Sequence, residues 1–215
     1  MNGSVVERAK SRLLLIVIIG SISLALLFFF SLAIGAYGMS FETAISSFFN
    51  LIANFGVPQN MDENIIMNSR LPRTLSVIGV GIGLSIAGAV MQAIIRNPLV
   101  DPYITGVASG AALGASLVVM GGVTIAGMGL YSMPLAAFAG AIIAFGLTMA
   151  LSEAAGGKPI SFVLAGVMIG LGFSSITNIL SVLNPDEHKG IMFWMFGSFQ
   201  AVNLDQTMII LVPTL

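Results

Sequence analysis

The feature that most restricts the fold of this chain is a series of apolar segments long enough to cross a lipid bilayer. A transmembrane helix needs about 20 apolar residues to span roughly 30 Å of hydrocarbon. The sequence therefore predicts an all-α fold, a polytopic transmembrane helical bundle in which residues 1–215 form a single domain. Five complete spans are predicted, and a sixth begins near Leu204 and is cut off at Leu215. The five are Leu13–Ala36, Thr74–Ile95, Tyr103–Met120, Tyr131–Leu151 and Ile160–Leu183.

The composition supports a membrane protein and excludes several other classes. Only 8% of the residues are charged, whereas a soluble domain carries about 25%, so the chain cannot cover itself with a water-compatible surface. The net charge of −1 excludes a basic footprint for nucleic acid. Without cysteine and with a single histidine, His188, the chain offers little for a metal site, a cofactor or acid–base catalysis. We therefore predict no catalytic residue, no metal and no cofactor.

Two shorter segments are expected to lie at the membrane surface. Phe41–Asn54 has the pattern of a short amphipathic helix, and Ile191–Phe199 is similar. The first apolar run, Leu13–Ala36, follows basic residues as a signal peptide does, but it is long enough to span and lacks a small-residue cleavage site. We therefore interpret it as a membrane span.

Basic residues favour an orientation with the N-terminus in the cytoplasm, because cytoplasmic loops carry an excess of Lys and Arg. In this orientation the residues on the inside are Arg8, Lys10, Arg12, Arg96 and Lys158, and those on the outside are Arg70, Arg73 and Lys189. Arg70 and Arg73 are exceptions to the rule. They either anchor a helix at the headgroups or form a fixed basic spot that docks an acidic partner.

Glycines recur at helical spacing within the predicted spans. Gly106, Gly110 and Gly114 follow one another every four residues on the third span, and Gly166 and Gly170 do the same on the fifth. Small residues at this spacing let helix backbones approach closely in lipid. We expect these five glycines to be helix-packing positions.

Several short motifs, taken together, resemble those of one membrane protein family. They are Arg70-Leu71-Pro72-Arg73, Gly88-Ala89-Val90-Met91-Gln92, Asn97-Pro98-Leu99, Asp101-Pro102, Gly106-Val107-Ala108-Ser109-Gly110-Ala111, Leu164-Ala165-Gly166-Val167 and Trp194-Met195-Phe196-Gly197-Ser198. In order and spacing the chain resembles the FecCD/BtuC-type permeases of ABC importers, which take up iron–siderophores, haem and cobalamin. The resemblance covers essentially the whole chain.

The resemblance implies a type II ABC importer permease in the cell membrane, working by alternating access with several partners. These are a second permease subunit that completes a homodimer or a heterodimer, two ATP-binding subunits on the cytoplasmic side and a substrate-binding protein outside. The chain itself is then not an enzyme. Gly157-Lys158-Pro159 is its nearest approach to a phosphate-binding loop, and it lacks both the first glycine and the serine or threonine of that motif.

The resemblance also implies roles for individual residues. Arg70 and Arg73 match arginines that pair with glutamates of the binding protein. Asn97 and Leu99, with Pro159 and Ile160, match two cytoplasmic gates, although Pro159 and Ile160 stand where the cobalamin relative has small hydroxyl residues. The polar residues able to line the path are Gln92, Asn97, Ser109, Ser161 and Asn178. Each of them could instead make an interhelical hydrogen bond.

Three questions stay open at the level of sequence. The family continues beyond the residue that matches Leu215, so we expect a fragment without the later helices and the coupling loop, unable to transport alone. A secondary transporter driven by an ion gradient is the alternative, although it usually has an acidic residue within a span, and here all of them lie at ends or in loops. The substrate is a siderophore, haem or cobalamin, with iron–siderophore favoured because that group is the broadest.

Overall fold

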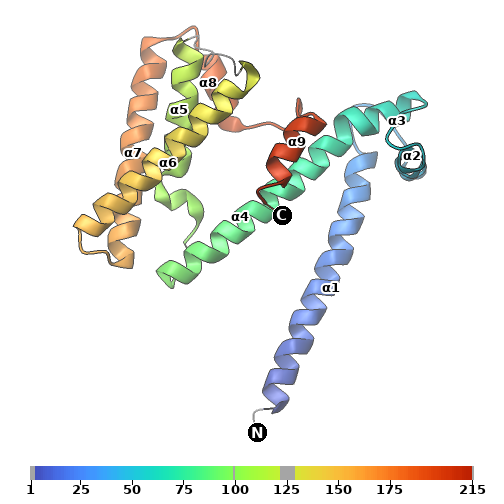
Figure 1. Ribbon diagram of the computed structural model, residues 1–215, viewed down its shortest axis with the longest axis horizontal. Coiled ribbons are helices and arrows are strands. Elements are labelled where there is room, and N and C mark those ends of the chain that lie inside the picture. The colour runs from blue at the N-terminus through green and yellow to red at the C-terminus, as the bar shows by residue number, and fades with distance from the viewer. Residues whose placement is uncertain (1–2, 99, 122–128, 215) are drawn as a thin grey trace. The chain divides into compact units, whose positions relative to one another are not determined.

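The structure, a computed structural model, describes residues 3–98, 100–121 and 129–214, and these residues form helices without any strand among them. Figure 1 shows their order along the chain. The α-helices are α1 (Gly3–Ala33), α2 (Phe41–Ala53), α3 (Met61–Ile65), α4 (Leu71–Ile95), α5 (Val107–Gly121), α6 (Ser132–Ala154), α7 (Pro159–Leu183), α8 (His188–Phe196) and α9 (Leu204–Leu211). A π-helical turn, η1 (Ile66–Arg70), and two 3₁₀ turns, η2 (Pro102–Thr105) and η3 (Gly129–Tyr131), complete the order.

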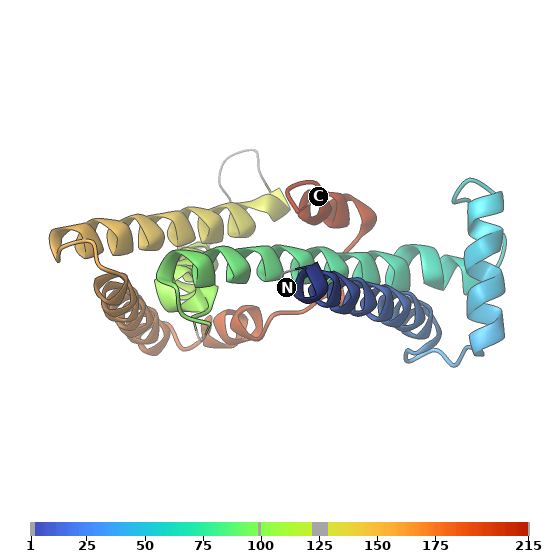
Figure 2. The same cartoon turned by 90° about the horizontal axis from the view of Figure 1, so that it is seen from below.

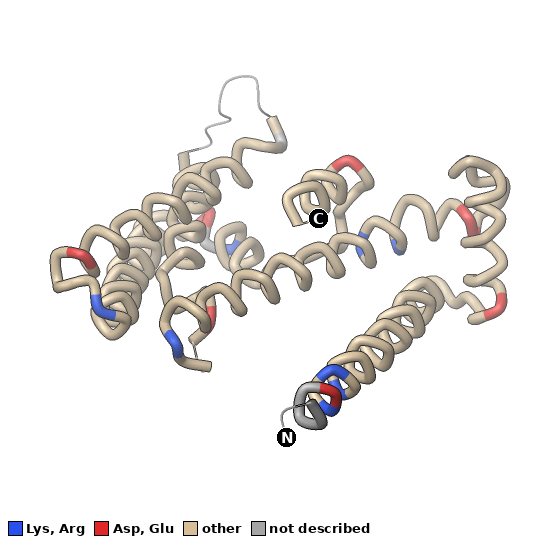
Figure 3. The backbone as a smooth tube through the Cα atoms, turned by 60° about the horizontal axis from the view of Figure 1, so that its bottom comes forward, with Lys and Arg blue, Asp and Glu red and all other residues tan. Residues whose placement is uncertain are grey.

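The predicted all-α fold is confirmed. Within the described residues, 4 helical stretches are long and apolar enough to cross a membrane. They are Glu7–Ala33, Met61–Ile95, Ser132–Ala154 and Pro159–Leu183. Figure 3 shows long uncharged stretches along the helices. Most charged residues lie near helix ends or in connections, whereas Arg70 and Arg73 lie within the stretch Met61–Ile95, where α4 begins. This distribution is what a hydrocarbon environment requires of spanning helices.

The third predicted span, Tyr103–Met120, differs from the prediction. Its first residues form η2, in which the amide of Ile104 donates to the Asp101 carboxylate at 3.2 Å. Gly106 then adopts a left-handed conformation with φ of 78°, so that α5 begins only at Val107 and has 15 residues. A helix of that length rises about 22 Å, less than the hydrocarbon thickness. Four of the five predicted spans thus correspond to long apolar helices, and the third corresponds to the shorter apolar helix α5, which begins later than predicted.

The contacts between residues divide the chain into two compact units. Unit 1 comprises Met1–Gly81 and Phe199–Leu215, and unit 2 comprises Ile82–Ser198. The core of unit 1 lies between the end of α1, α2 and the turn η1. Its buried side chains are Leu32, Ala33, Ala44, Leu51 and Ile66.

Helix α9 packs on the first half of α4 within unit 1. The buried hydroxyl of Thr207 lies 3.0 Å from that of Ser76 and donates to the carbonyl of Pro72 at 3.1 Å. The helix begins where the sixth span was expected to begin, because Asn203 and Gln206 form a reciprocal capping box there. The predicted start near Leu204 is thus confirmed.

The two short surface helices are present with adjusted bounds. Helix α2 matches the predicted Phe41–Asn54 closely, with the Ser40 hydroxyl accepting from the amide of Thr43 at 3.0 Å as its N-cap. Helix α8 starts and stops three residues before the predicted Ile191–Phe199, as its bounds of His188–Phe196 show. It ends at Gly197, whose φ of 69° suits a residue without a Cβ atom.

In unit 2, helices α5, α6 and α7 lie side by side (Figures 1 and 2). A Cβ atom built on Gly110 or Gly114 of α5 would lie closer than 3.0 Å to the backbone of Gly140 or Ala136 of α6, respectively. The two helices therefore touch backbone to backbone.

Gly106, Gly166 and Gly170 form a separate contact. The sequence placed Gly106 on one helix with Gly110 and Gly114. In the structure Gly106 precedes α5, so it does not share a helix face with them. A Cβ atom on Gly106 would lie 3.2 Å from both the carbonyl oxygen of Gly166 and the amide of Gly170 on α7. The break before α5 thus packs on α7.

Candidate functional site

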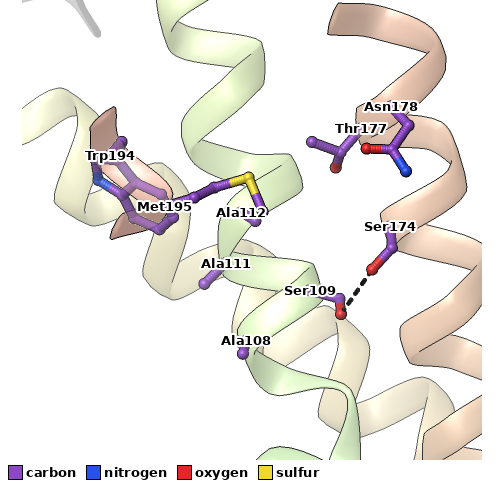
Figure 4. A pocket seen from close by; sticks show the side chains of 9 residues that line it. All are labelled: Ala108, Ser109, Ala111, Ala112, Ser174, Thr177, Asn178, Trp194 and Met195. Atoms are coloured by element: carbon purple, nitrogen blue, oxygen red, sulfur yellow. Dashed lines mark hydrogen bonds between the residues drawn. The ribbon is translucent and has the colours of Figure 1, made fainter. Parts of the chain in front are cut away.

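Unit 2 contains a cavity of about 400 Å³ between α5, α7 and α8. Figure 4 shows it from close by, with the side chains of the three helices around it. Its lining residues are Ala108, Ser109, Ala111, Ala112, Ser174, Thr177, Asn178, Trp194 and Met195. None of these side chains is charged, so the cavity presents a neutral surface.

The walls of the cavity differ in chemistry. Ser174 and Asn178 from α7 bring a hydroxyl and an amide, and Ser174 donates a hydrogen bond to the hydroxyl of Ser109 on α5 at 3.1 Å (Figure 4). Trp194 and Met195 from α8 bring an aromatic ring and a thioether. Such walls contact a ligand through neutral hydrogen bonds and dispersion, without the strong Coulomb attraction that would retain an ion.

Helical spacing explains why these residues meet. Ser174 and Asn178 are four residues apart on α7, and Ser109 and Ala112 are three apart on α5, so each pair shares a helix face. Helix α8 is held in place by Ile191, which is 2% exposed. The cavity therefore results from the faces that three packed helices turn toward one another.

Two of the five predicted path residues line the cavity, whereas Gln92, Asn97 and Ser161 do not. Ser109 and Asn178 are among its lining residues. Gln92 is exposed on α4 and is not one of them. Ser161 near the start of α7 donates to the carbonyl of Ala155 at 3.1 Å, which closes the turn between α6 and α7. Its role as a path residue stays a prediction.

The other seven lining residues were not predicted from the sequence. Three are alanines of α5, and the other four are Ser174, Thr177, Trp194 and Met195. The four-residue spacing between Ser174 and Asn178 was a usable signal, because it puts two polar side chains on one face of an apolar helix. Nothing in the sequence pattern indicated that α8 would supply a wall.

The segments that carry the predicted gate residues lie against each other. An apolar cluster joins the end of α4, the connection to η2 and the start of α7 through Met91, Ile95, Val100, Ile104, Phe162 and Val163. Asn97 lies exposed in the turn after α4, and Pro159 and Ile160 are the first, exposed residues of α7. Leu99 lies outside the described residues.

Arg70 has a structural role at the end of α1 that the sequence did not predict. Its side chain is 7% exposed, and its guanidinium donates to the carbonyls of Leu32, Ala33 and Tyr37, with 2.7 Å to that of Ala33. The sulfur of Met39 lies 3.8 Å away. The last carbonyls of a helix have no intrahelical donors and carry partial negative charge, so a cation stabilises them. Arg70 therefore caps α1, and its predicted docking role stays a prediction.

Arg73, three residues further on, stays accessible. Its side chain is exposed, and it lines a groove of about 880 Å³ whose walls are mostly apolar residues of α1 and α4. Arg70 lines the same groove, but of the two arginines of the motif Arg73 has the more exposed side chain.

The apolar spanning helices and the backbone contacts between them are those of a membrane-embedded helical protein, and the cavity between them is uncharged. A sequence model of the FecCD transport family matches residues 23–215. The chain belongs to this family.

The chain is similar to several curated permeases. It is 34% identical to the ferric enterobactin permease FepD of Escherichia coli K12 over 222 residues, which cover 100% of this chain and 61% of that protein. It is 33% identical to the Fe(3+)-citrate permease YfmD of Bacillus subtilis 168, covering 94% of this chain and 57% of YfmD. The chain thus spans less than two thirds of the length of these relatives.

A solved structure shares the fold. It is an inward-facing conformation of an ABC transporter assigned to the metal-chelate type, with a TM-score of 0.72 and 29% sequence identity. The match covers 90% of this chain and 56% of the other. The helical arrangement described above is therefore that of an ABC importer permease.

Proposed function

We propose that the chain acts as a permease subunit of an ABC importer in the cytoplasmic membrane and moves an iron chelate inward by alternating access. The observation that carries this proposal is the family match over residues 23–215. Relatives named for ferric enterobactin and for Fe(3+)-citrate support a ferric chelate as substrate. Haem and cobalamin are the other candidates, the latter because a vitamin B12 permease of Salmonella paratyphi A is 36% identical over 160 residues.

The partners follow from this function. A second permease copy would complete the path, two cytoplasmic subunits would hydrolyse ATP, and an extracytoplasmic protein would deliver the chelate. Both compact units would then belong to one transmembrane permease domain whose N-terminus lies in the cytoplasm. The uncharged cavity suits a path of this kind, because a bulky chelate must enter and leave without being held tightly.

Co-purification tests the ATP-driven mechanism. The natural protein would be tagged, extracted gently from its own membranes and examined by mass spectrometry. We expect a subunit with a phosphate-binding loop to accompany it. Recovery without any ATPase, together with iron uptake that collapses with the ion gradient, would instead support a secondary transporter.

Asn178 gives a test of the cavity. Replacing Asn178 by leucine removes a polar group from the wall of α7, and an interhelical or ligand hydrogen bond in membrane proteins contributes about 1–2 kcal/mol. We expect uptake of a radiolabelled ferric chelate to fall about tenfold, since about 1.4 kcal/mol corresponds to a factor of ten in rate. The control is Ser175→Ala on the same helix, whose hydroxyl donates to the carbonyl of Leu171. Equal uptake in both variants would show that the cavity is not part of the transport path.

Arg73 gives a test of docking. Charge reversal in Arg73→Glu should weaken binding of the substrate-binding protein about tenfold or more, because like charges across an interface repel. Surface plasmon resonance on the permease in nanodiscs would measure this at low salt. Lys189→Glu, at the start of α8, is the matched control for a general change of charge. Loss of binding in both variants to the same degree would exclude a specific contact at Arg73.

A further inference from the structure

Helix α2 crosses the end of α1 instead of continuing along it. In Figure 1 α1 runs within the plane of the view and α2 is seen end-on, whereas Figure 2 shows α2 along its length. Both helices belong to unit 1. Because α1 is an apolar span, a helix that lies across its end runs parallel to the membrane plane.

Aromatic side chains join the two helices. Ring centroids lie 5.4 Å apart for Phe28 and Phe48, and 6.3 Å apart for Phe29 and Phe49, which are stacked. The rings of Phe30 and Phe41 form a third pair, 4.9 Å apart. Phe30, Phe41 and Phe49 remain exposed. The exposed apolar surface of α1 therefore continues without interruption onto α2.

The far end of α2 extends this apolar surface. Ile52, Phe55 and Val57 are exposed at and beyond its last turn, and Phe55 is 96% exposed. The opposite face of the helix is buried through Ala44, Ser47 and Leu51. The exposed side chains are thus not needed for the core of unit 1.

Phe55 also occupies an unfavourable backbone conformation. Its φ is 53°, in the left-handed region, which a bulky L-residue rarely adopts. The turn itself is closed by the amide of Gly56, which donates to the carbonyl of Leu51 at 2.7 Å and involves no side chain. Neither packing nor backbone geometry favours phenylalanine here, so its benefit lies in what it contacts outside the chain.

The distribution of charge points to lipid as the contact. Between Arg12 and Arg70 the sequence has no Lys or Arg, and the acidic residue of α2, Glu42, lies in its first turn. A surface without basic residues does not attract an acidic protein partner or select anionic headgroups. Its continuity with the exposed apolar face of the spanning helix α1 fits the acyl region just below the headgroups.

We propose that α2 and the turn after it, residues 41–57, form an interfacial anchor that inserts Ile52 and Phe55 into the leaflet at the C-terminal end of α1. The anchor fixes the depth of that end of α1, and with it the level of the Arg70 cap. It acts by apolar burial and requires no anionic lipid.

Spin labels measure the insertion directly. The natural protein, with any other cysteine replaced, would carry a nitroxide on Phe55→Cys in phosphatidylcholine nanodiscs. Collision rates would be compared for oxygen, which concentrates in lipid, and for a nickel chelate, which stays in water. We expect oxygen to dominate at position 55. The matched control is Gln59→Cys, an exposed polar position in the same connection, where the nickel chelate should dominate.

Two outcomes would overturn the proposal. A label at position 55 that collides mainly with the nickel chelate lies in water, and a label protected from both reagents is covered by protein. A second variant separates anchoring from folding, because asparagine adopts the left-handed region readily. Phe55→Asn should keep the melting temperature in detergent, yet shift a label on Ile52→Cys toward the nickel chelate. An unchanged label at position 52 would show that Phe55 does not anchor the helix.

Discussion

Replacing Arg70 by alanine is expected to destabilise the protein by about 3 kcal/mol, because hydrogen bonds to a charged group contribute about 1.5–3 kcal/mol each. The guanidinium donates to three carbonyls around the end of α1, and those of Leu32 and Ala33 would lose this donor in a buried site. Unfolding of the purified protein by titration with a denaturing detergent measures the change. Arg70→Lys should recover only part of the loss, since an ammonium lacks the planar fork of donors.

Arg73→Ala is the matched control for this prediction. It removes the same side chain three residues away on the same helical stretch, where the side chain is exposed. Exposed positions usually change stability by no more than about 0.5 kcal/mol. Equal destabilisation by the two substitutions would contradict the capping role of Arg70. Gly35→Ala tests the same cap from the other side. Its Cβ atom would lie 3.0 Å from Nη2 of Arg70 and so would crowd the guanidinium.

The two arginines show where sequence reasoning stops. In the sequence they stand as equivalent basic residues of one motif, and both were interpreted as docking residues. What separates them is the π-helical turn Ile66–Arg70 and the return of the chain at Gly35–Tyr37, which together place one guanidinium over the end of α1. Neither feature has a signal in residue spacing, so burial of Arg70 had to be seen in the structure.

The spans were predictable because lipid leaves the backbone few options. Each buried amide must be satisfied within its own segment, so a long apolar run is a helix. The one span whose start was misplaced is interrupted at Gly106, whose left-handed conformation breaks an otherwise apolar run. Hydropathy does not register such a break, since glycine is frequent within membrane helices.

The cavity was predictable only in part. Ser109 and Asn178 stand out as polar residues within apolar helices, and both line it. Trp194 was not predicted as a lining residue, because its role depends on where α8 docks. That docking is a tertiary contact between α8 and α5, which no periodicity within α8 encodes.

Replacing Gly140 by valine is expected to separate α5 from α6, with a loss of about 3 kcal/mol, at the upper end of typical overpacking costs. A Cβ atom at Gly140 would overlap the carbonyl oxygen of Gly110, and Gly110 in turn has no space toward Gly140. A backbone atom cannot rotate away as a side chain does, so the helices must move apart. Detergent-induced unfolding and the yield of folded protein measure the effect.

Gly146→Val gives the same substitution on the same helix without the contact. No heavy atom lies within 4 Å of a Cβ atom at Gly146, which is exposed. Valine there changes mainly helix propensity, by less than about 1 kcal/mol. Comparable losses of stability in both variants would mean that valine destabilises α6 irrespective of its position in the helix. A loss confined to Gly140→Val would show that backbone contact between α5 and α6 holds unit 2 together, and with it the helix that carries Ser109 into the cavity.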